Sequence, residues 1–225
     1  MMLGVIMLDT RFVRLPGDIG HPASHAGPVL FETVPRATAA RVVGGIASLT
    51  DPAAREAAVG PFVAAGERLV ARGATAITTS CGFLVTYQDA LQAALPVPVM
   101  TSALCLLPEI AAGRRVGVLT FDAASLGAMH LRAAGFAGEC AVAGLAQGCG
   151  FRREVLEDAA TVDAAGREAD VLEAAGRLPG DVEVVLLECT NFPPHRAAVF
   201  GLLGVPVFDV WDAVRRLNDL SRRHG

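Results

Sequence analysis

Six short apolar runs, most of them closed by a polar residue, constrain the fold of this chain more than any other feature. The runs cover residues 3–8, 74–80, 97–100, 116–121, 182–188 and 205–208. Continuous apolar runs of this length are typical of parallel strands that are buried on both faces. Alanine-rich segments of helical composition lie near residues 53–72, 85–94, 123–134, 152–177 and 194–203. Strands that alternate with helices predict an α/β fold with parallel sheets.

The runs also recur at a fixed spacing. Cys81 and Cys189 each follow an apolar run and lie 108 positions apart, as do VPVM at 97–100 and VPVF at 205–208. A third pair, LGVIMLD from residue 3 and VGVLTFD from residue 116, is 113 positions apart, which a five-residue insertion explains. The repeat indicates a duplicated chain.

Duplication predicts two pseudo-symmetric halves, each a short parallel sheet flanked by helices, with a cleft between them. We place the halves at residues 1–104 and 105–208. The remaining segment, 209–225, is expected to form a helix over 209–223 that packs back on the first half.

The composition excludes several kinds of chemistry. All 19 basic residues are arginine, so neither a pyridoxal-phosphate aldimine, nor a Schiff-base aldolase, nor a Walker A loop can be built. A net charge of −4 argues against nucleic acid as a partner. The apolar start is short, lacks a basic region and is interrupted by Asp9, so we expect neither export nor a membrane span, and a cytoplasmic protein with free thiols.

The two repeated cysteines lie where ligands bind in parallel sheets, beyond the carboxyl ends of strands. Facing each other across one cleft, Cys81 and Cys189 have the geometry for removing a proton from one face of a carbon acid and returning one on the other. Gly82 and Pro193 suit helix starts directly after them, and helix N-termini stabilise thiolates. We therefore expect both thiols to be candidates for thiolate stabilisation, with no cofactor and no metal ion.

Further residues near these strand ends are candidates for substrate binding. Oriented N–H groups and hydroxyls would stabilise the carbanion, and Arg11 and Arg14, in the loop after the first strand, suit a carboxylate. We expect His195 to tune Cys189 or to bind a carboxylate. The candidate donors of N–H and hydroxyl groups are Ser80, Gly82, Thr120, Thr190 and Asn191. His21, His25 and Asp18 lie in the same loop, but its prolines and glycines preclude a regular metal-binding helix face.

The sequences TTSCGF at 78–83 and ECTNFPPH at 188–195, with the opening GVIMLD, resemble the aspartate/glutamate/hydantoin racemase superfamily over nearly the whole chain. The resemblance implies two α/β halves and a cofactor-independent racemase or epimerase, in which Cys81 and Cys189 act as paired acid and base. It also implies that Asp9 orients a thiol or the substrate amine, and that Thr190 belongs to the family's cysteine-threonine pair.

The chain departs from the family pattern on both sides of the expected cleft. The amino-acid racemases usually carry cysteine-asparagine-threonine at the first site, where this chain has Cys81, Gly82 and Phe83, and Phe83 would make the pocket more apolar. At the second site Asn191 replaces a histidine. The substrate is thus an amino acid, a hydantoin or a related small carboxylate, and the sequence does not fix it.

Two alternatives remain open. The first is an isomerase or lyase of the same superfamily, such as a maleate-type cis–trans isomerase or a decarboxylase, that uses one cysteine as nucleophile or acid. The second is a non-catalytic sensor that binds a metabolite in the same cleft. The partner expected in each case is a small molecule. The oligomeric state is not fixed by the sequence, and a homo-oligomer is compatible with it.

Overall fold

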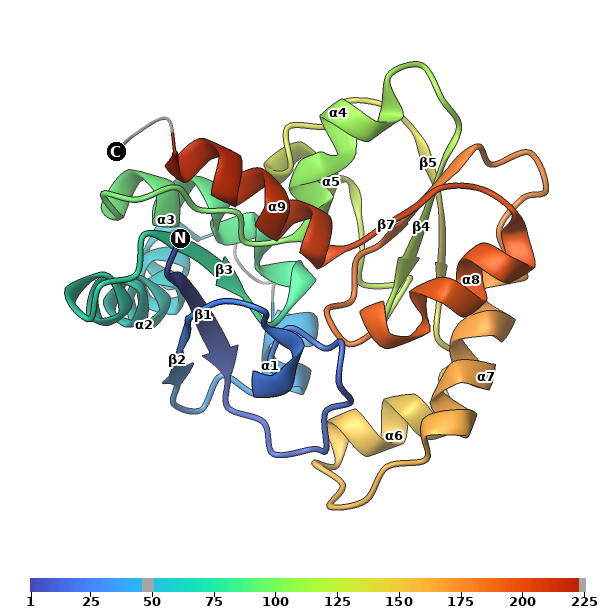
Figure 1. The fold of residues 1–225 in the computed structure, drawn as a ribbon, viewed down its shortest axis with the longest axis horizontal. Helices are drawn as coiled ribbons and strands as arrows, with labels where there is room; N and C mark the ends of the chain where they lie inside the picture. The colour runs from blue at the N-terminus through green and yellow to red at the C-terminus, as the bar shows by residue number, and fades with distance from the viewer. Residues whose placement is uncertain (46–50, 223–225) are drawn as a thin grey trace.

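The strands form two parallel sheets, as the apolar runs predict. The computed structural model describes residues 1–45 and 51–222. Within this part of the chain, one sheet has three strands in the order β2-β1-β3 and the other has four in the order β5-β4-β6-β7. Figure 1 shows each sheet in its own half of the molecule, with helices around it. The α/β fold of two parallel sheets flanked by helices is confirmed.

The central strand of each sheet comes first in its half. The strands are β1 (Leu3–Leu8), β2 (Val29–Val34), β3 (Ala76–Thr79), β4 (Val116–Thr120), β5 (Cys140–Gly144), β6 (Val184–Leu187) and β7 (Val207–Phe208). In the first sheet Leu3 of β1 is in register with Val29 and Ala76, and in the second Val116 of β4 is in register with Cys140 and Val184. Both central strands are almost entirely buried, which explains their continuous apolar sequences.

The spacing of 108 residues extends into the strand register. Ile77 of β3 forms an isolated parallel bridge with Val99, and Val185 of β6 pairs with Val207 of β7. The two pairs therefore correspond residue for residue. The predicted strand at 97–100 is reduced to this single bridge, because the side chains of Gln88 and Gln92 bond the remaining backbone groups of Val99.

The sequence patterns missed β2 and β5. Both are edge strands, and most of their residues are only half-buried. An edge strand that is partly open to water does not need an unbroken apolar sequence, and Glu32 and Thr33 interrupt β2 accordingly. A search for continuous apolar runs therefore finds the more deeply buried strands, including β3 and β7 at the other edges of the sheets, and overlooks these two.

Helices cover both sheets. They are α1 (Ala39–Gly45), α2 (Pro52–Ala71), α3 (Gln88–Ala94), α4 (Leu107–Ala111), α5 (Ala128–Ala133), α6 (Gly150–Leu156), α7 (Ala164–Ala175), α8 (Arg196–Leu203) and α9 (Val210–Ser221), with short 3-10 turns η1 (Pro22–Ser24), η3 (Gly82–Tyr87), η4 (Ala103–Leu106) and η5 (Pro193–His195). Asp51 begins α2 by accepting a hydrogen bond from the Ala54 N–H, and Pro52 suits the first helical position.

Three predicted helices differ from the structure. The segment 152–177 forms two helices, α6 and α7, because Asp158 adopts a left-handed backbone (φ 52°) and Asp163 caps a new helix through the Gly166 N–H. The segment 123–134 is helical only over α5. The segment 85–94 begins within η3 and becomes α-helical at Gln88.

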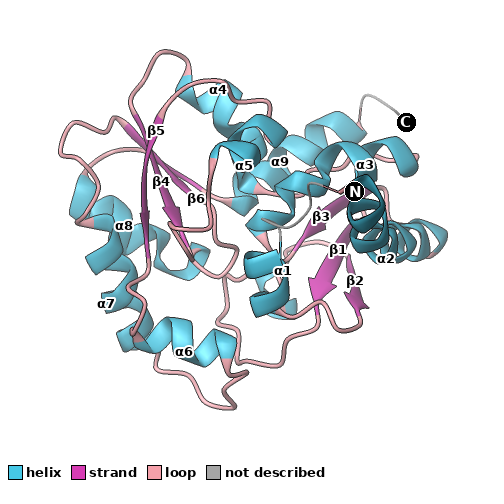
Figure 2. Ribbon diagram, turned by 180° about the vertical axis from the view of Figure 1, so that it is seen from behind, coloured by secondary structure: helices cyan, strands magenta, loops and turns pink. Residues whose placement is uncertain are grey.

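The last helix spans the seam between the halves. α9 contacts β3 and η4, and Figures 1 and 2 show it across the seam from opposite sides. The predicted helix 209–223 ends at Ser221, and residues 223–225 lie outside the described part. The domain boundary at 104/105 stays a prediction.

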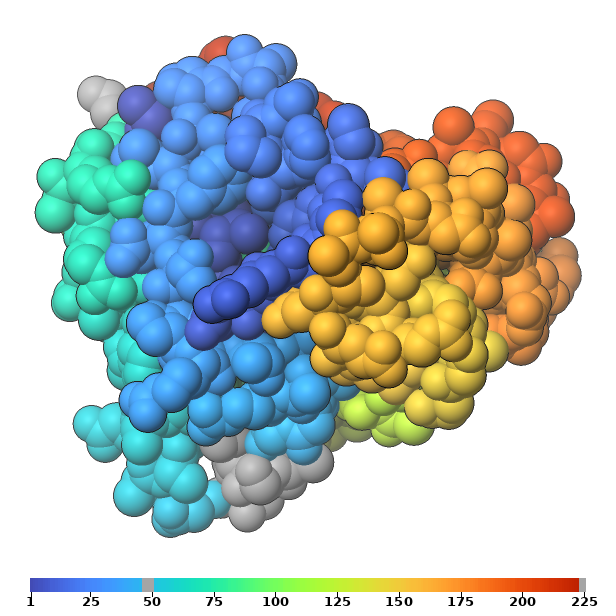
Figure 3. Space-filling model, turned by 90° about the horizontal axis from the view of Figure 1, so that it is seen from below, coloured from blue at the N-terminus to red at the C-terminus, as the bar shows by residue number. Residues whose placement is uncertain are grey.

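A second contact joins the halves at the loop after β1. The Arg11 N–H donates to Asp158 Oδ1 (2.8 Å), and the Val13 N–H donates to the Ala159 carbonyl (3.3 Å). Figure 3 shows this blue loop against the yellow and orange segment. The loop from Asp9 to His21 is therefore held by both halves.

Candidate active site

The carboxyl ends of β3 and β6 meet at the seam and bring the two cysteines to one cavity. Cys81 follows β3 and precedes η3, while Cys189 follows β6 and precedes η5. The two turns are joined directly, because the Thr190 hydroxyl donates to the Ser80 carbonyl (2.7 Å). Ser80 is itself fixed to β1, since its hydroxyl accepts the Leu8 N–H (2.9 Å).

The cavity is small and mostly apolar. Its lining residues come from both halves and from the loop after β1. They are Leu8, Thr10, Phe12, Arg14, Ala39, Val43, Ser80, Cys81, Gly82, Phe83, Phe121, Val155, Glu188, Cys189, Thr190 and Asn191. Phe83 lines the cavity and meets the His130 ring edge-on at 5.3 Å.

Four residues expected to bind substrate do not line this cavity. Asp9 Oδ2 accepts the Arg36 N–H (2.8 Å) and holds the turn after β2. The Arg11 side chain is exposed. The Thr120 hydroxyl lies behind the cavity wall and donates to Glu188 Oε2 (2.8 Å). His195 is buried, with Nδ1 3.6 Å from Glu168 Oε2 and its ring edge-on to Phe151.

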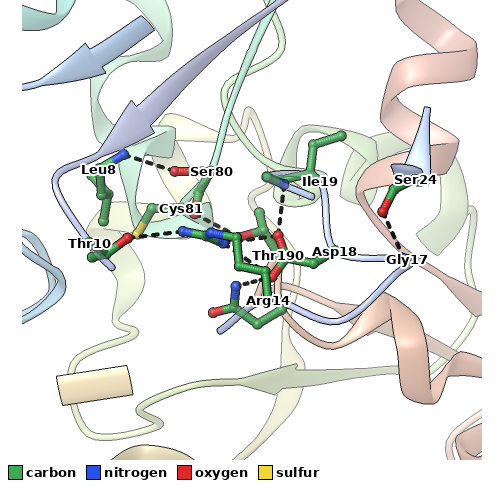
Figure 4. Close-up of polar contacts among 12 residues, drawn as sticks. Leu8, Thr10, Arg14, Gly17, Asp18, Ile19, Ser24, Ser80, Cys81 and Thr190 are labelled. Carbon is green, nitrogen blue, oxygen red and sulfur yellow. Dashed lines mark hydrogen bonds and ion pairs between the residues drawn. The ribbon is translucent and has the colours of Figure 1, made fainter. Parts of the chain in front are cut away.

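Arg14 lines the cavity, but its charge is already compensated. Its guanidinium donates to both carboxylate oxygens of Asp18 (2.9 and 3.1 Å) and to the Thr10 hydroxyl (3.1 Å), as Figure 4 shows. Asp18 is 1% exposed and also accepts the Gly20 N–H. A carboxylate that approached this arginine would therefore compete with a buried ion pair.

Asp18 connects the loop to the second cysteine. Asn191 Nδ2 donates to Asp18 Oδ2 (2.5 Å), which turns the amide oxygen of Asn191 toward Cys189. The Cys189 thiol donates to that oxygen at 3.6 Å. Sequence reasoning missed Asp18, because the residue lies in an irregular loop 173 positions away from its partner Asn191.

Sequence reasoning also missed Glu188. It is completely buried at the end of β6, lines the cavity between the two cysteine turns, and keeps Oε1 without a hydrogen-bond partner in the described part of the chain. Burial raises the pKa of the Glu188 carboxyl to about 7, although the hydrogen bonds from Thr120 and the Phe121 backbone act in the opposite direction. The signal in the sequence that could have identified Glu188 is an acidic residue at the end of a buried apolar run.

Gly82 leaves the space that Glu188 uses. A Cβ built on Gly82 would fall inside contact distance of both Oε1 and the carbonyl oxygen of Glu188. The glycine after the first cysteine and the glutamate before the second are therefore sterically coupled across the seam. This contact explains why an asparagine does not fit after Cys81 in this chain.

Both thiols are protonated in the free protein near neutral pH, which corrects the expectation of stabilised thiolates. Burial and the neighbouring Glu188 raise the pKa of Cys81 to about 12 and raise that of Cys189 well above its ordinary value. The Phe83 and Leu84 N–H groups and Arg14 act in the opposite direction on Cys81, as does the Asn191 N–H on Cys189. The N–H groups are thus in place, but the loss of water outweighs them.

No cluster of three or more metal-ligating side chains occurs within residues 1–45 and 51–222. Among the helices of the same residues, none is long and apolar enough to cross a bilayer.

Comparison with known proteins assigns this chain to one family of enzymes. The family model described as Asp/Glu/Hydantoin racemase matches residues 32–217. The chain belongs to this family, and the recognition from its cysteine motifs is confirmed.

Solved structures share the fold. Unliganded arylmalonate decarboxylase superposes with a TM-score of 0.59 at 20% identity, covering 96% of this chain and 92% of that one. Allantoin racemase from Klebsiella pneumoniae gives a TM-score of 0.57 at 17% identity, covering 100% and 89%.

Curated relatives are closer in sequence. A protein named dimethylsulfoniopropionate lyase, from Durusdinium sp. clade D, is 30% identical over 92% of this chain and 70% of its own length. The chain spans between 43% and 70% of the curated relatives it matches. Proteins that share the fold are thus named racemase or decarboxylase, and the curated relatives are named lyases.

Proposed function

We propose that this protein is a cofactor-independent racemase or epimerase that acts on the carbon next to a carboxylate or carbonyl group. The observation that carries the proposal is the pair of thiols, one from each half, that line one small cavity. In the reaction, one cysteine sulfur, as the thiolate, takes the α-proton, and the electron pair of the broken C–H bond is delocalised into the adjacent carboxylate or carbonyl. The opposite thiol then donates its proton to the other face of the carbon.

Several contacts of the free site support this reaction. N–H groups of the first residues of η3 point toward the Cys81 sulfur, and the Asn191 N–H points toward the Cys189 sulfur. These donors are fixed before substrate arrives, so they can stabilise a developing thiolate without reorganisation. Binding of a carbon acid also excludes the remaining water, which strengthens each of these interactions.

A second candidate is β-elimination from a carboxylate with a sulfonium leaving group, and the lyase-named relatives favour it. The first step is the same removal of an α-proton by a thiolate. The Cα–Cβ double bond then forms as the Cβ–S bond breaks, and the electron pair leaves with a dialkyl sulfide. Phe12, Phe83 and Phe121 line the cavity, and aromatic rings suit a sulfonium cation.

Proton NMR in deuterium oxide separates the two candidates. The purified protein is incubated with amino acids, hydantoins, hydroxy acids and dimethylsulfoniopropionate. A racemase removes the α-hydrogen signal of its substrate and leaves the carbon skeleton intact, and chiral chromatography then shows both enantiomers. A lyase produces vinyl resonances and a volatile sulfide. Saturable binding without exchange identifies a sensor instead, and the absence of exchange from every compound overturns the proposal for these substrate classes.

A further inference from the structure

The Glu188 carboxyl lines the cavity and has a hydrogen-bond partner on only one of its two oxygens within the described residues. Oε2 accepts the Thr120 hydroxyl at 2.8 Å. Oε1 is buried beside Gly82 and has no partner within the described residues. The Glu188 N–H is tied to the Leu119 carbonyl of β4 (2.8 Å), so the backbone that carries the carboxyl is fixed.

The charges around Glu188 do not favour its ionised form. The titratable groups that face Glu188 are the two thiols. Cys81 precedes η3, and Cys189 is the residue that follows Glu188 after β6. Among the described residues no cation is paired with Glu188, because the nearby Arg14 is held by Asp18. An isolated carboxylate in such surroundings costs several kcal/mol, whereas a neutral acid does not.

We propose that Glu188 carries its proton on Oε1 when substrate binds and donates a hydrogen bond to a carboxylate oxygen of that substrate. Thr120 leaves Oε2 as the acceptor, which puts the proton on the open oxygen. The proposal rests on the proposed function for the position of the reacting carbon between the thiols. It adds that the ligand bears an acidic oxygen acceptor and that Glu188, not Arg14, receives it.

This role makes carboxylate binding depend on pH. Because burial raises the pKa of Glu188 to about 7, the carboxyl is a neutral donor below that pH and an anion above it. Above pH 7 the donor is lost, and its negative charge repels both the bound carboxylate and a thiolate. Binding of a carboxylate is therefore strongest below the Glu188 pKa and falls as pH rises through it.

Alkylation of the cavity thiols measures this effect without turnover. Iodoacetate carries a carboxylate, whereas iodoacetamide is its neutral analogue of similar size. In both reactions the thiolate sulfur forms a bond to the CH₂ carbon as the C–I bond breaks and iodide leaves. Mass spectrometry gives the rate at each cysteine, and the ratio of the two rates cancels the fraction of thiolate. Cys140 and Cys149 do not line the cavity and serve as internal references.

In the unchanged protein, the ratio of the iodoacetate rate to the iodoacetamide rate at Cys81 and Cys189 is expected to fall at least about tenfold between about pH 6 and about pH 8.5. A neighbouring like charge changes an ionisation equilibrium by about one pKa unit or more, which is a factor of about ten. Glu188→Gln keeps a neutral donor, so its ratio should stay flat. Glu183→Gln, an exposed change in the same segment, should behave like the unchanged protein. Thr120→Val removes a bond that lowers the Glu188 pKa, so the midpoint should move to higher pH.

A flat ratio in the unchanged protein, or the same fall in Glu188→Gln, overturns the proposal. If circular dichroism shows that Glu188→Gln does not fold, the pH profiles of the unchanged protein and of Thr120→Val still decide. The outcome is also separate from that of the proposed function. A pH-dependent ratio without α-hydrogen exchange leaves Glu188 as a carboxylate donor in a protein with another activity. Exchange with a flat ratio leaves the enzyme reaction and removes Glu188 from it.

Discussion

The two cysteine turns occupy equivalent places in the repeat but have different surroundings. Each follows a buried strand beside the central strand of its sheet, and each precedes a 3-10 turn. Glu188 raises the pKa of both thiols, but Cys81 also faces two backbone N–H groups and the guanidinium of Arg14, which favour a thiolate. Cys189 faces only one backbone N–H that favours a thiolate, and the acidic side chain of Asp18 adds to Glu188 in favouring the thiol.

The difference shows how a duplicated fold can give two similar groups different roles. The strand, cysteine and turn that both halves share set the position of each thiol, and residues that occur in only one half set the charge around it. Arg14 and Asp18 both come from the loop after β1. Arg14 favours the thiolate at Cys81, whereas Asp18 favours the thiol at Cys189. Both thiols nevertheless hold their protons in the free protein, because burial is the largest influence on each and raises both pKa values.

Replacing either thiol is expected to have the largest effect. Cys81→Ser and Cys189→Ser should each lower the racemisation rate by a factor of about 10²–10⁴, the usual contribution of a positioned acid or base. Chiral chromatography measures racemisation, and NMR in deuterium oxide measures exchange from each enantiomer separately. Each variant should keep residual exchange from a single enantiomer, and the two variants should differ in which one. Racemisation at the unchanged rate in both would rule out the two-thiol reaction.

Removing the acid that links Arg14 to Asn191 tests how the second turn is held. Asp18→Asn leaves the buried Arg14 guanidinium without its partner and should lower the free energy of unfolding by about 3–5 kcal/mol. It should also lower the pKa of Cys189, because Asp18 raises it. Urea denaturation measures the first effect, and the pH dependence of iodoacetamide labelling measures the second.

The matched control for Asp18→Asn is Glu173→Gln, which breaks the exposed ion pair with Arg177. That change should cost no more than about 0.5 kcal/mol. Equal losses in the two variants would contradict a structural role for the buried pair.

A smaller loss of stability is expected from Gly82→Ala, which tests the contact between the two turns. The added methyl group would overlap Glu188, so one turn must move, at a cost of about 1–3 kcal/mol. Gly60→Ala is the control, because its Cβ meets nothing within 4 Å on the exposed side of α2. It should be neutral or stabilising by up to about 1 kcal/mol. If thermal denaturation shows no difference between these variants, the turns are not tightly coupled.

The deeply buried strands and the cysteine pair were readable from the sequence, because both depend on local patterns that repeat. β2 and β5 were not, since strands that are only half-buried need no unbroken apolar run. Among the expected substrate-binding residues, Arg14, Ser80, Gly82, Phe83, Thr190 and Asn191 line the cavity with the cysteines. Asp9, Arg11, Thr120 and His195 do not, because proximity to a strand end along the chain does not fix the direction of a side chain.

The sequence by itself determined the parallel strands, their 108-residue repeat and the presence of a cysteine at each equivalent strand end. Only the tertiary structure decided the electrostatics of the site. The raised pKa values of Cys81, Cys189 and Glu188 come from burial at the seam, and the compensation of Arg14 comes from a loop held by both halves. Burial and charge pairing depend on which surfaces exclude water when distant segments meet, and no local pattern records that.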